Sequence, residues 1–518
     1  MQLVPTWFNA LADGDIRPLS WGALISFTKD YDDDIIFFTY NVSEYNGADV
    51  YAPTGDNPLQ SWDKYEYTDY SERIIYQSVQ RELEFPYSVV SAIADFSLNN
   101  YDDYFTPNSG SPLSDYIIPK RPVRLLQGFS TALLPQFVGL TQGMPDIAHE
   151  EGTATFTAMD FLTQIYSMPI RNTEAMQNVR TDEILANIFA QFGLTPDQYD
   201  LGHGRNVVKF LFFEKDQQTA GDVIRPLMQA EGGLLWLSEE GIIKFRPRLE
   251  QPTTSSYTFD SDSIITLSVS SDDQIINHVI INTDVREVQD FQTVYSKKTS
   301  DNTLNVIPAG ESAVFVAELQ DPVLTVEEPV YGSNADVSWF TAATYDGTDV
   351  TSGVSITSVE LKTNTYEMTI ENTNGFDVNI NQMSIWAQPA KRISVEPIIY
   401  ENKDQDSIDK YEDKPLEISN NFIQDIDTAR SLAITILDEY AEYADIIEME
   451  VKGNPAIQLS DINTVDYDSY SGQYRLIGTS NKLQDSKYTQ IIKARGYNPR
   501  TWFQYDVSEY NGPDVYAP

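Results

Sequence analysis

The sequence predicts a mainly β protein with a small α+β region. Three observations support this prediction. Short alternating polar and apolar segments recur through the first 168 residues. The apolar period becomes helical between about 169 and 250, and strand patterns return after 256 with one long helix among them. A chain of 518 residues, 41% of them apolar, can form three or four domains with cores of their own.

The first region contains several short strand patterns. Residues 92–98 alternate, and turn-forming residues at 99–103 follow them. Further strands are expected at 123–126, 137–139 and 153–159. This spacing is typical of a closed or nearly closed antiparallel barrel.

Two helices and a hairpin are expected in the next region. Thr181 is a suitable N-cap for a helix that ends at Gly193. A second helix should start at Thr219, where Pro226 is expected to kink it or shorten its start. Segments 234–237 and 242–245, on either side of a turn, then predict a hairpin.

The last region returns to strands. We expect strands at 263–269 and 278–282, a sandwich-like stretch at 305–390, and strands at 448–451, 474–477 and 488–493. Asp427 is expected to cap one long helix between them. Its predicted inner face consists of Ala429, Leu432, Ala433, Ile436, Leu437 and Tyr440.

Composition limits the possible functions. The 34 basic and 78 acidic residues give a net charge of -44, which argues against a general phosphate-binding surface. The absence of cysteine excludes disulfides and thiolate metal sites. No secretory signal and no membrane-spanning run is expected, so synthesis should take place in a cytoplasm.

Two nearly identical peptides stand out. Residues 40–53 and 505–518 agree at 12 of 14 positions, and each contains an Asn-Gly turn between extended segments. They could be a duplicated structural hairpin, or two copies of one docking element. The expected docking residues are Tyr40, Tyr45, Asn46, Gly47, Tyr51, Tyr505, Tyr510, Asn511, Gly512 and Tyr516.

Catalytic motifs are missing from the sequence. The three histidines, His149, His203 and His278, are isolated, and no hydrolase, nucleotide-binding or metalloprotease motif is present. The acidic run 32–34 and the pair Asp466 and Asp468 lack the spacing of a calcium loop. We therefore expect no catalytic residues, no bound metal and no cofactor.

Segment 418–495 contains three motifs: Asn420 or Asn421 followed by Phe422 and Ile423, the run G-N-P-A-I-Q-L-S-D at 453–461, and Tyr-Thr-Gln at 488–490. Through these motifs it resembles the last barrel of phage and prophage tail hub proteins. The family usually has Gly where Ser460 stands, so the turn is expected to be built differently here. Residues 219–248 are similar to the small hub domain, 272–279 to a strand that opens the last barrel, and 305–390 to an inserted sandwich.

This resemblance implies two related β-barrel domains, a small α+β domain and an inserted β-sandwich. The implied divisions are a first barrel at 1–168, the α+β domain at 169–255, a second barrel from 256–304 and 391–498, the insert at 305–390, and a docking arm at 499–518 that repeats 40–53. The family also implies a homotrimer and no catalytic residues.

The resemblance further implies a structural hub at the distal end of a virion tail. Three subunits with two barrels each would match a six-fold neighbour, and the two peptides would dock on it. The expected partners are a hexameric distal tail ring or tail tube protein above, a tape measure protein or a tail fibre or spike below, and DNA that passes through the channel without specific binding. The alternatives are a carbohydrate-binding adhesin using Trp339, Phe340 and Trp386, or a wall-degrading enzyme.

Overall fold

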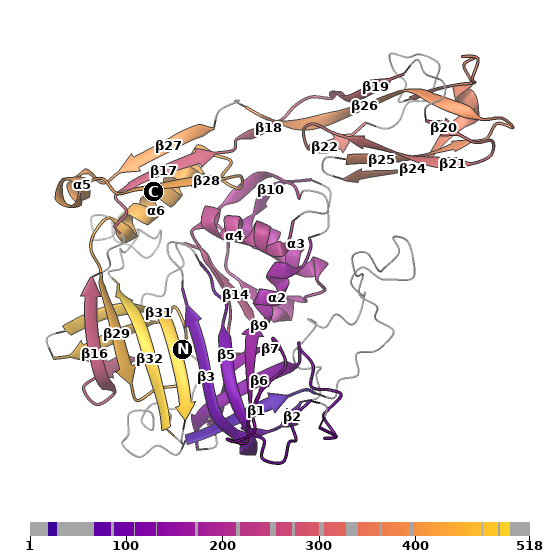
Figure 1. Ribbon diagram of the computed structural model, residues 1–518. Helices are drawn as coiled ribbons and strands as arrows, with labels where there is room; N and C mark the ends of the chain where they lie inside the picture. Colours follow the sequence, from indigo (N-terminus) through magenta and orange to yellow (C-terminus); the bar gives the residue numbers. More distant parts are fainter. Residues whose placement is uncertain are drawn as a thin grey trace.

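The chain is mainly β, as the sequence predicted, and Figure 1 shows its arrangement in a computed structural model. The five largest groups of buried apolar residues form its main cores. The structure describes residues 19–27, 67–83, 88–107, 109–130, 132–170, 175–213, 218–248, 255–271, 275–299, 305–327, 340–362, 365–393, 397–468, 470–484 and 487–497.

The first barrel has its strands in the order β2-β1-β6-β7-β9-β5-β3. Residues 68–82 close it, because their start pairs with β1 and their end pairs with β5. Alternation along β5 places Ala94, Phe96 and Leu98 in the interior, where the Phe96 ring stacks on Phe156. The predicted strands are therefore confirmed. The elements are β1 (Leu19–Ile25), β2 (Thr68–Asp69), η2 (Ser71–Arg73), β3 (Ile74–Glu82), β5 (Ile93–Asn99), β6 (Pro122–Phe129), β7 (Ala132–Thr141), β8 (Asp146–Ala148) and β9 (Thr153–Asp160).

The α+β region packs three helices against short sheets. The first long helix begins at Thr181 with Arg180 as its N-cap, so the expected Thr181 cap is wrong: the Thr181 hydroxyl is buried and donates to Glu231 instead. The second helix begins at Ala220 with Thr219 as its N-cap and continues through Pro226, so the proline does not shorten its start. The elements are α2 (Phe161–Ser167), β10 (Met176–Arg180), α3 (Thr181–Gln191), η3 (Pro196–Gln198), β11 (Tyr199–Leu201), β12 (Val207–Leu211), α4 (Ala220–Glu231), β13 (Leu234–Leu237), β14 (Ile243–Arg246) and, paired with β13, β4 (Ser88–Val89).

The second barrel has the strand order β15-β30-β31-β32-β29-β16. Residues 258–271 close it in the same way, since their start pairs with β30 and their end with β29. Its interior is filled by residues such as Phe259, Met449 and Leu476. The elements are β15 (Thr258–Asp260), β16 (Ile264–Ser271), β29 (Asp445–Val451), β30 (Ile462–Tyr467), β31 (Tyr470–Gln484) and β32 (Lys487–Gly496).

A separate three-stranded sheet corrects the expected content of the second barrel. The strand near 278, expected to open that barrel, pairs instead with β27 and β28, because α6 covers this sheet and supplies a core of its own. All six predicted inner-face residues of α6 are buried, but its N-cap is Asp425, whose carboxylate accepts from the Thr428 amide at 2.7 Å, and not Asp427. The elements are β17 (His278–Thr283), β27 (Ile398–Lys403), α5 (Gln405–Tyr411), β28 (Pro415–Asn420) and α6 (Ile426–Tyr440).

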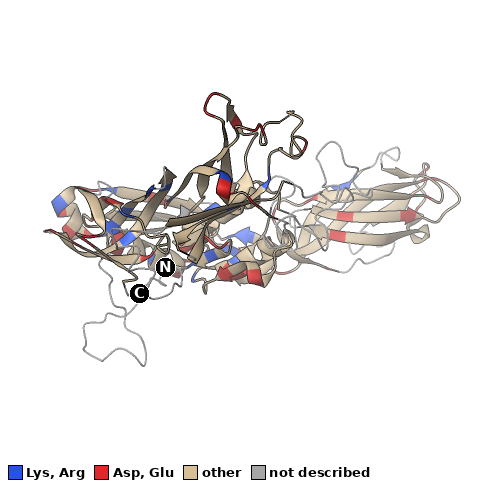
Figure 2. Cartoon of the chain, turned by 90° about the horizontal axis from the view of Figure 1, so that it is seen from below, with Lys and Arg blue, Asp and Glu red and all other residues tan. Residues whose placement is uncertain are grey.

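The insert consists of two sheets around one core and extends away from the barrels (Figure 1). It begins earlier than the expected 305, because β18 and β19 already pair with β26. Residues 305–390 contain 12 Asp or Glu and one Lys, and Figure 2 marks Asp and Glu positions in red along the strands of the insert. The elements are β18 (Arg286–Val288), β19 (Gln292–Lys298), β20 (Val306–Ile307), β21 (Ser312–Glu318), β22 (Val323–Val326), β23 (Phe340–Ala343), η4 (Thr351–Gly353), β24 (Val354–Lys362), β25 (Thr365–Asn372) and β26 (Val378–Arg392).

Candidate functional site

The two barrels are fused into one continuous sheet. Strand β3 of the first barrel pairs antiparallel with the second half of β31, from Tyr76 opposite Gln484 to Glu82 opposite Gly478. The first half of β31 pairs with β30 of the second barrel. Because β31 belongs to the second barrel and also forms the edge for the first, the relative position of the barrels is fixed by a hydrogen-bond ladder.

Buried polar side chains line this joint. The side-chain amide of Gln136, on β7, donates to the Pro455 carbonyl at 2.8 Å and accepts from the Asn481 amide at 3.0 Å. Both amides are almost fully buried. Because a buried polar group without a partner is costly, each of these bonds favours one register of the joint.

Arg81 is the central residue of the joint. Its Nη2 donates to the Gln136 carbonyl at 2.6 Å, and its Nη1 lies 3.5 Å from Glu239 Oε1 in the hairpin of the α+β region. The side chains of Arg81 and Glu239 are 4% and 5% exposed. Gln458 Nε2 also donates to Glu239, at 2.7 Å. Glu239 thus contacts both barrels, the first through its ion pair with Arg81 and the second through its hydrogen bond from Gln458.

A second buried carboxylate lies close to this ion pair. Burial raises the pKa of Asp160, while hydrogen bonds from the Ala92 and Thr163 amides and the charge of Arg81 act to lower it. Because the pKa is raised in the folded state, the ionised carboxylate of Asp160 destabilises the fold at a pH above that pKa. This destabilisation is relieved as the pH falls through the folded-state pKa and the carboxylate is protonated. The carboxylate caps α2 and holds the start of β5, which is a structural arrangement.

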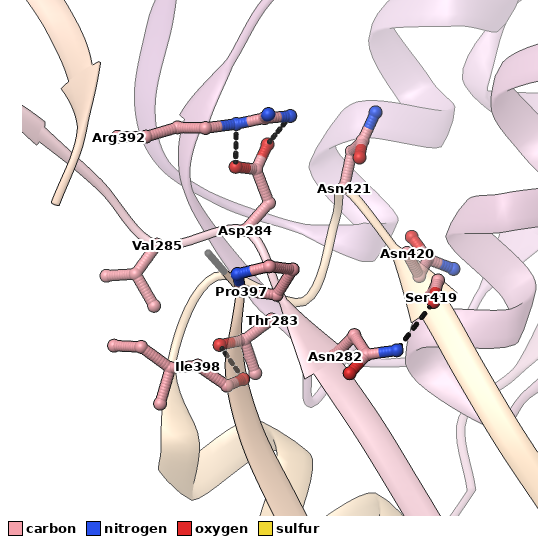
Figure 3. Close-up of a pocket in the computed structure, with 10 residues that line it drawn as sticks. All are labelled: Asn282, Thr283, Asp284, Val285, Arg392, Pro397, Ile398, Ser419, Asn420 and Asn421. Atoms are coloured by element: carbon pink, nitrogen blue, oxygen red, sulfur yellow. Dashed lines mark hydrogen bonds and ion pairs between the residues drawn. The ribbon is translucent and has the colours of Figure 1, made fainter. Parts of the chain in front are cut away.

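A small cavity lies where the insert joins the three-stranded sheet (Figure 3). It measures about 140 Å³. At its edge Asp284 accepts hydrogen bonds from Arg286 Nε at 3.2 Å and Arg392 Nε at 2.6 Å, one arginine on each strand that leads into the insert. Asn282 donates to the Ser419 hydroxyl on the neighbouring strand β28. These contacts hold the base of the insert, and we assign them to its attachment.

Ser460 occupies the turn where the tail hub family usually has Gly. Its φ is +67°, the left-handed conformation that glycine adopts freely, so Ser460 holds a backbone conformation that is strained for a serine. The Ser460 hydroxyl accepts from Arg246 Nη1 at 2.9 Å. The side chain thus compensates in part for the strain of the left-handed backbone.

Replacing Ser460 separates these two effects. Ser460→Gly removes the strain, about 1–2 kcal/mol, together with a hydrogen bond that contributes about as much, and should be nearly neutral. Ser460→Ala keeps the strain and loses the bond, so it should be the less stable variant by roughly 1–2 kcal/mol. Urea unfolding of both variants against the wild type checks this. Equal stability of the Gly and Ala variants would contradict the strain argument.

The predicted docking residues lie outside the part of the chain that the structure describes. This applies to the whole set, Tyr40, Tyr45, Asn46, Gly47, Tyr51, Tyr505, Tyr510, Asn511, Gly512 and Tyr516. Their role stays a prediction.

The three histidines weighed for chemistry lie in different regions of the fold, and the acidic run 32–34 lies outside the described residues. His278 is buried, with Nδ1 2.9 Å from Asp413 and Nε2 3.0 Å from Glu401, while His149 and His203 are exposed. Within the described ranges no three His, Asp or Glu side chains group as metal ligands, and no helix has the length and apolar character to cross a membrane.

The two described aromatic residues considered for an adhesin differ in exposure. Phe340 is buried in the core of the insert, and Trp386 is 36% exposed. Trp339 lies outside the described residues. Of the two described side chains, only Trp386 could therefore contact a glycan at the surface.

One repeat was missed in the sequence. Residues 68–82, T-D-Y-S-E-R-I-I-Y-Q-S-V-Q-R-E, and 258–272, T-F-D-S-D-S-I-I-T-L-S-V-S-S-D, are identical at six of fifteen positions. These are the segments that close the two barrels, and each has a register shift at the same place, between Ile74 and Tyr76 and between Ile264 and Thr266. A self-comparison at a spacing of 190 residues would have found them.

The two barrels therefore share one topology. With β1 set aside, the order β2-β6-β7-β9-β5-β3 corresponds strand by strand to β15-β30-β31-β32-β29-β16. Strands β2 and β6 are parallel because both are antiparallel to β1, and β15 and β30 are parallel as well. The first barrel is the second with one strand added.

Comparison with known proteins gives structural neighbours only. No family model matches the chain, and no curated protein does. The solved structures to which it is similar include the 43 kDa tail protein of prophage MuSo2 from Shewanella oneidensis, with a TM-score of 0.43, 10% identity and coverage of 83% of this chain and 95% of the other. A tail protein from Neisseria meningitidis has a TM-score of 0.44 and 8% identity, with coverage of 83% of this chain and 93% of the other. A prophage tail protein from Listeria monocytogenes has a TM-score of 0.41 and 9% identity, with coverage of 84% of this chain and 93% of the other.

All three are tail proteins.

Proposed function

We propose that this chain is a structural hub at the distal end of a phage tail or a related particle. It assembles as a homotrimer, closes the tail tube and matches a three-fold hub to a six-fold neighbour. It carries out no reaction. Its partners are a hexameric tail ring or tube protein on one side and a tape measure protein or a fibre or spike on the other.

The observation that carries this proposal is the fused pair of barrels with one topology. Two like units in a fixed relation present two like surfaces, and three such subunits present six. The buried ion pair and the amide network make the relation rigid. A catalytic protein has no need for two like barrels held in this way, whereas an adaptor between three-fold and six-fold rings does.

The repeated peptides support the same function. Three subunits would offer six copies of one sequence, 40–53 and 505–518, to six identical neighbours. Binding at several sites raises the overall affinity well above that of one peptide. The four tyrosines Tyr45, Tyr51, Tyr510 and Tyr516 would be the anchors.

The net charge fits a tube through which DNA passes. With a net charge of -44 the protein repels phosphate groups, so a channel wall made from it would not bind the DNA that passes through.

Mass in solution tests the trimer first. We expect a particle of three times 58.6 kDa by light scattering. A monomer of 58.6 kDa that binds glycans would contradict the proposal and favour an adhesin.

Deleting 505–518 tests the docking role. The truncated protein should keep the trimer mass, which serves as the folding control, and should lose incorporation into tails, because three of the six docking elements are missing. Replacing Tyr510 and Tyr516 by Ala should act in the same direction. Normal incorporation of the deletion variant would exclude the docking role.

A further inference from the structure

The joint between the barrels within one chain indicates how two copies of the chain meet. This inference rests on the homotrimer proposed above and names the surfaces that form it. In the first barrel, the closing strand β3 pairs with β5 on one edge and with β31 on the other. Its counterpart in the second barrel, β16, pairs with β29, and no other described strand pairs with it.

The equivalent strands β3 and β16 differ in side-chain exposure along the edge at which β31 pairs with β3. Gln77, Ser78 and Val79 on β3 are 0%, 4% and 1% exposed. At the corresponding positions on β16, Leu267 and Val269 are half-buried and Ser268 is exposed. The outer residues Ile75 and Ile265 are exposed alike, at 40% and 45%. The second barrel thus presents the edge that β31 covers in the first.

A matching edge exists at the far side of the first barrel. Strand β8 pairs with β9 as the second half of β31 pairs with β32. The two edges can be aligned residue by residue. Ala154 on β9 and Gln490 on β32 occupy equivalent positions, opposite Leu98 and Val451. Their partners on the other side are Ile147 on β8 and Asn481 on β31, which are therefore equivalent as well. Among the described strands, β9 alone pairs with β8.

These correspondences give the register of a joint between copies. In the chain, Lys482 lies opposite Ser78 and Asn481 opposite Val79. The equivalents of Lys482 and Asn481 are Ala148 and Ile147, and those of Ser78 and Val79 are Ser268 and Val269. We propose that β16 of one copy pairs antiparallel with β8 of a second copy of this chain, with Ala148 opposite Ser268 and Ile147 opposite Val269.

Both edges are suited to a second copy. An uncovered strand edge presents unpaired backbone groups and readily accepts another strand. The contact joins two different surfaces, so it repeats from copy to copy and closes a ring if the rotation is right. If the contact between chains has the same geometry as the joint within each chain, the three chains of the proposed homotrimer form a closed ring of six barrels.

Cysteine cross-linking tests this register, and no native disulfide can interfere because the chain has no cysteine. Residues directly opposite in an antiparallel pair lie within disulfide distance. The variant Ala148→Cys with Ser268→Cys should form, on mild oxidation, a covalent trimer on a non-reducing gel. The pair Ser78→Cys with Lys482→Cys, its equivalent within the chain, should close inside the monomer. The pair Ala148→Cys with Tyr345→Cys controls for random collision, because Tyr345 lies in the insert.

The outcomes separate this inference from the proposed function. A trimer by mass in which the pair at 148 and 268 cross-links no better than the collision control would overturn the strand pairing and leave the hub standing. A ladder that continues beyond three chains would exclude the closed ring. A monomer by mass would remove the proposed trimer together with the inference.

Discussion

Replacing Arg81 by Met should destabilise the joint between the barrels by about 3–5 kcal/mol, because it leaves Glu239 buried without its charged partner. The change also removes the bond to the Gln136 carbonyl. The amides of 478–484, which pair with β3, should exchange hydrogen for deuterium much faster than in the wild type. Hydrogen exchange measured by mass spectrometry locates the effect.

Two variants control this result. Lys493→Met breaks an exposed ion pair across the same joint, between Lys493 and Glu82 at 2.7 Å, and should cost about 0–1 kcal/mol. Adding Glu239→Leu to Arg81→Met should recover much of the loss, because no buried charge then remains unpaired. If Arg81→Met and Lys493→Met change exchange equally, the buried ion pair does not hold the joint.

Gly139→Ala should disrupt the first barrel. A Cβ at Gly139 would lie 2.2 Å from the Met159 carbonyl oxygen and 2.8 Å from its carbon, both backbone atoms of β9. Relief requires separating β7 from β9, which share only a short ladder. We expect a loss of about 3 kcal/mol or more, by analogy with overpacked cores, seen as a lower melting transition.

Gly143→Ala is the matched control for this change. No atom lies within 4 Å of a Cβ built at Gly143, four residues further along the chain, so the substitution should change stability by no more than about 0.5 kcal/mol. Similar melting of the two alanine variants would show that the close approach of β7 and β9 is not what limits this position.

Local patterns were predictive wherever one face of an element meets a core. The alternation at 92–98 became β5 with its interior residues as expected, and the inner face of α6 was right at all six positions. Burial of one face selects the apolar residues along that face, and this selection is visible in the sequence.

Helix ends were less predictable. Asp425 and Asp427 are both acceptable caps by residue type, and the choice of Asp425 depends on its extended backbone. Thr181 was misjudged because its hydroxyl is buried against Glu231, fifty residues away in the sequence.

The residues alone were enough to predict the class of the fold, the acidic character of the protein, the paired peptides and the helix α6 with its buried face. These depend on composition or on contacts between near neighbours. The tertiary structure alone showed that β31 spans both barrels, that Arg81 and Glu239 meet, and that, among the described strands, β16 and β8 each pair along one edge only. Such pairings join residues as far apart as Tyr76 and Gln484, and strand partners depend on the register of the whole sheet, which no local pattern records.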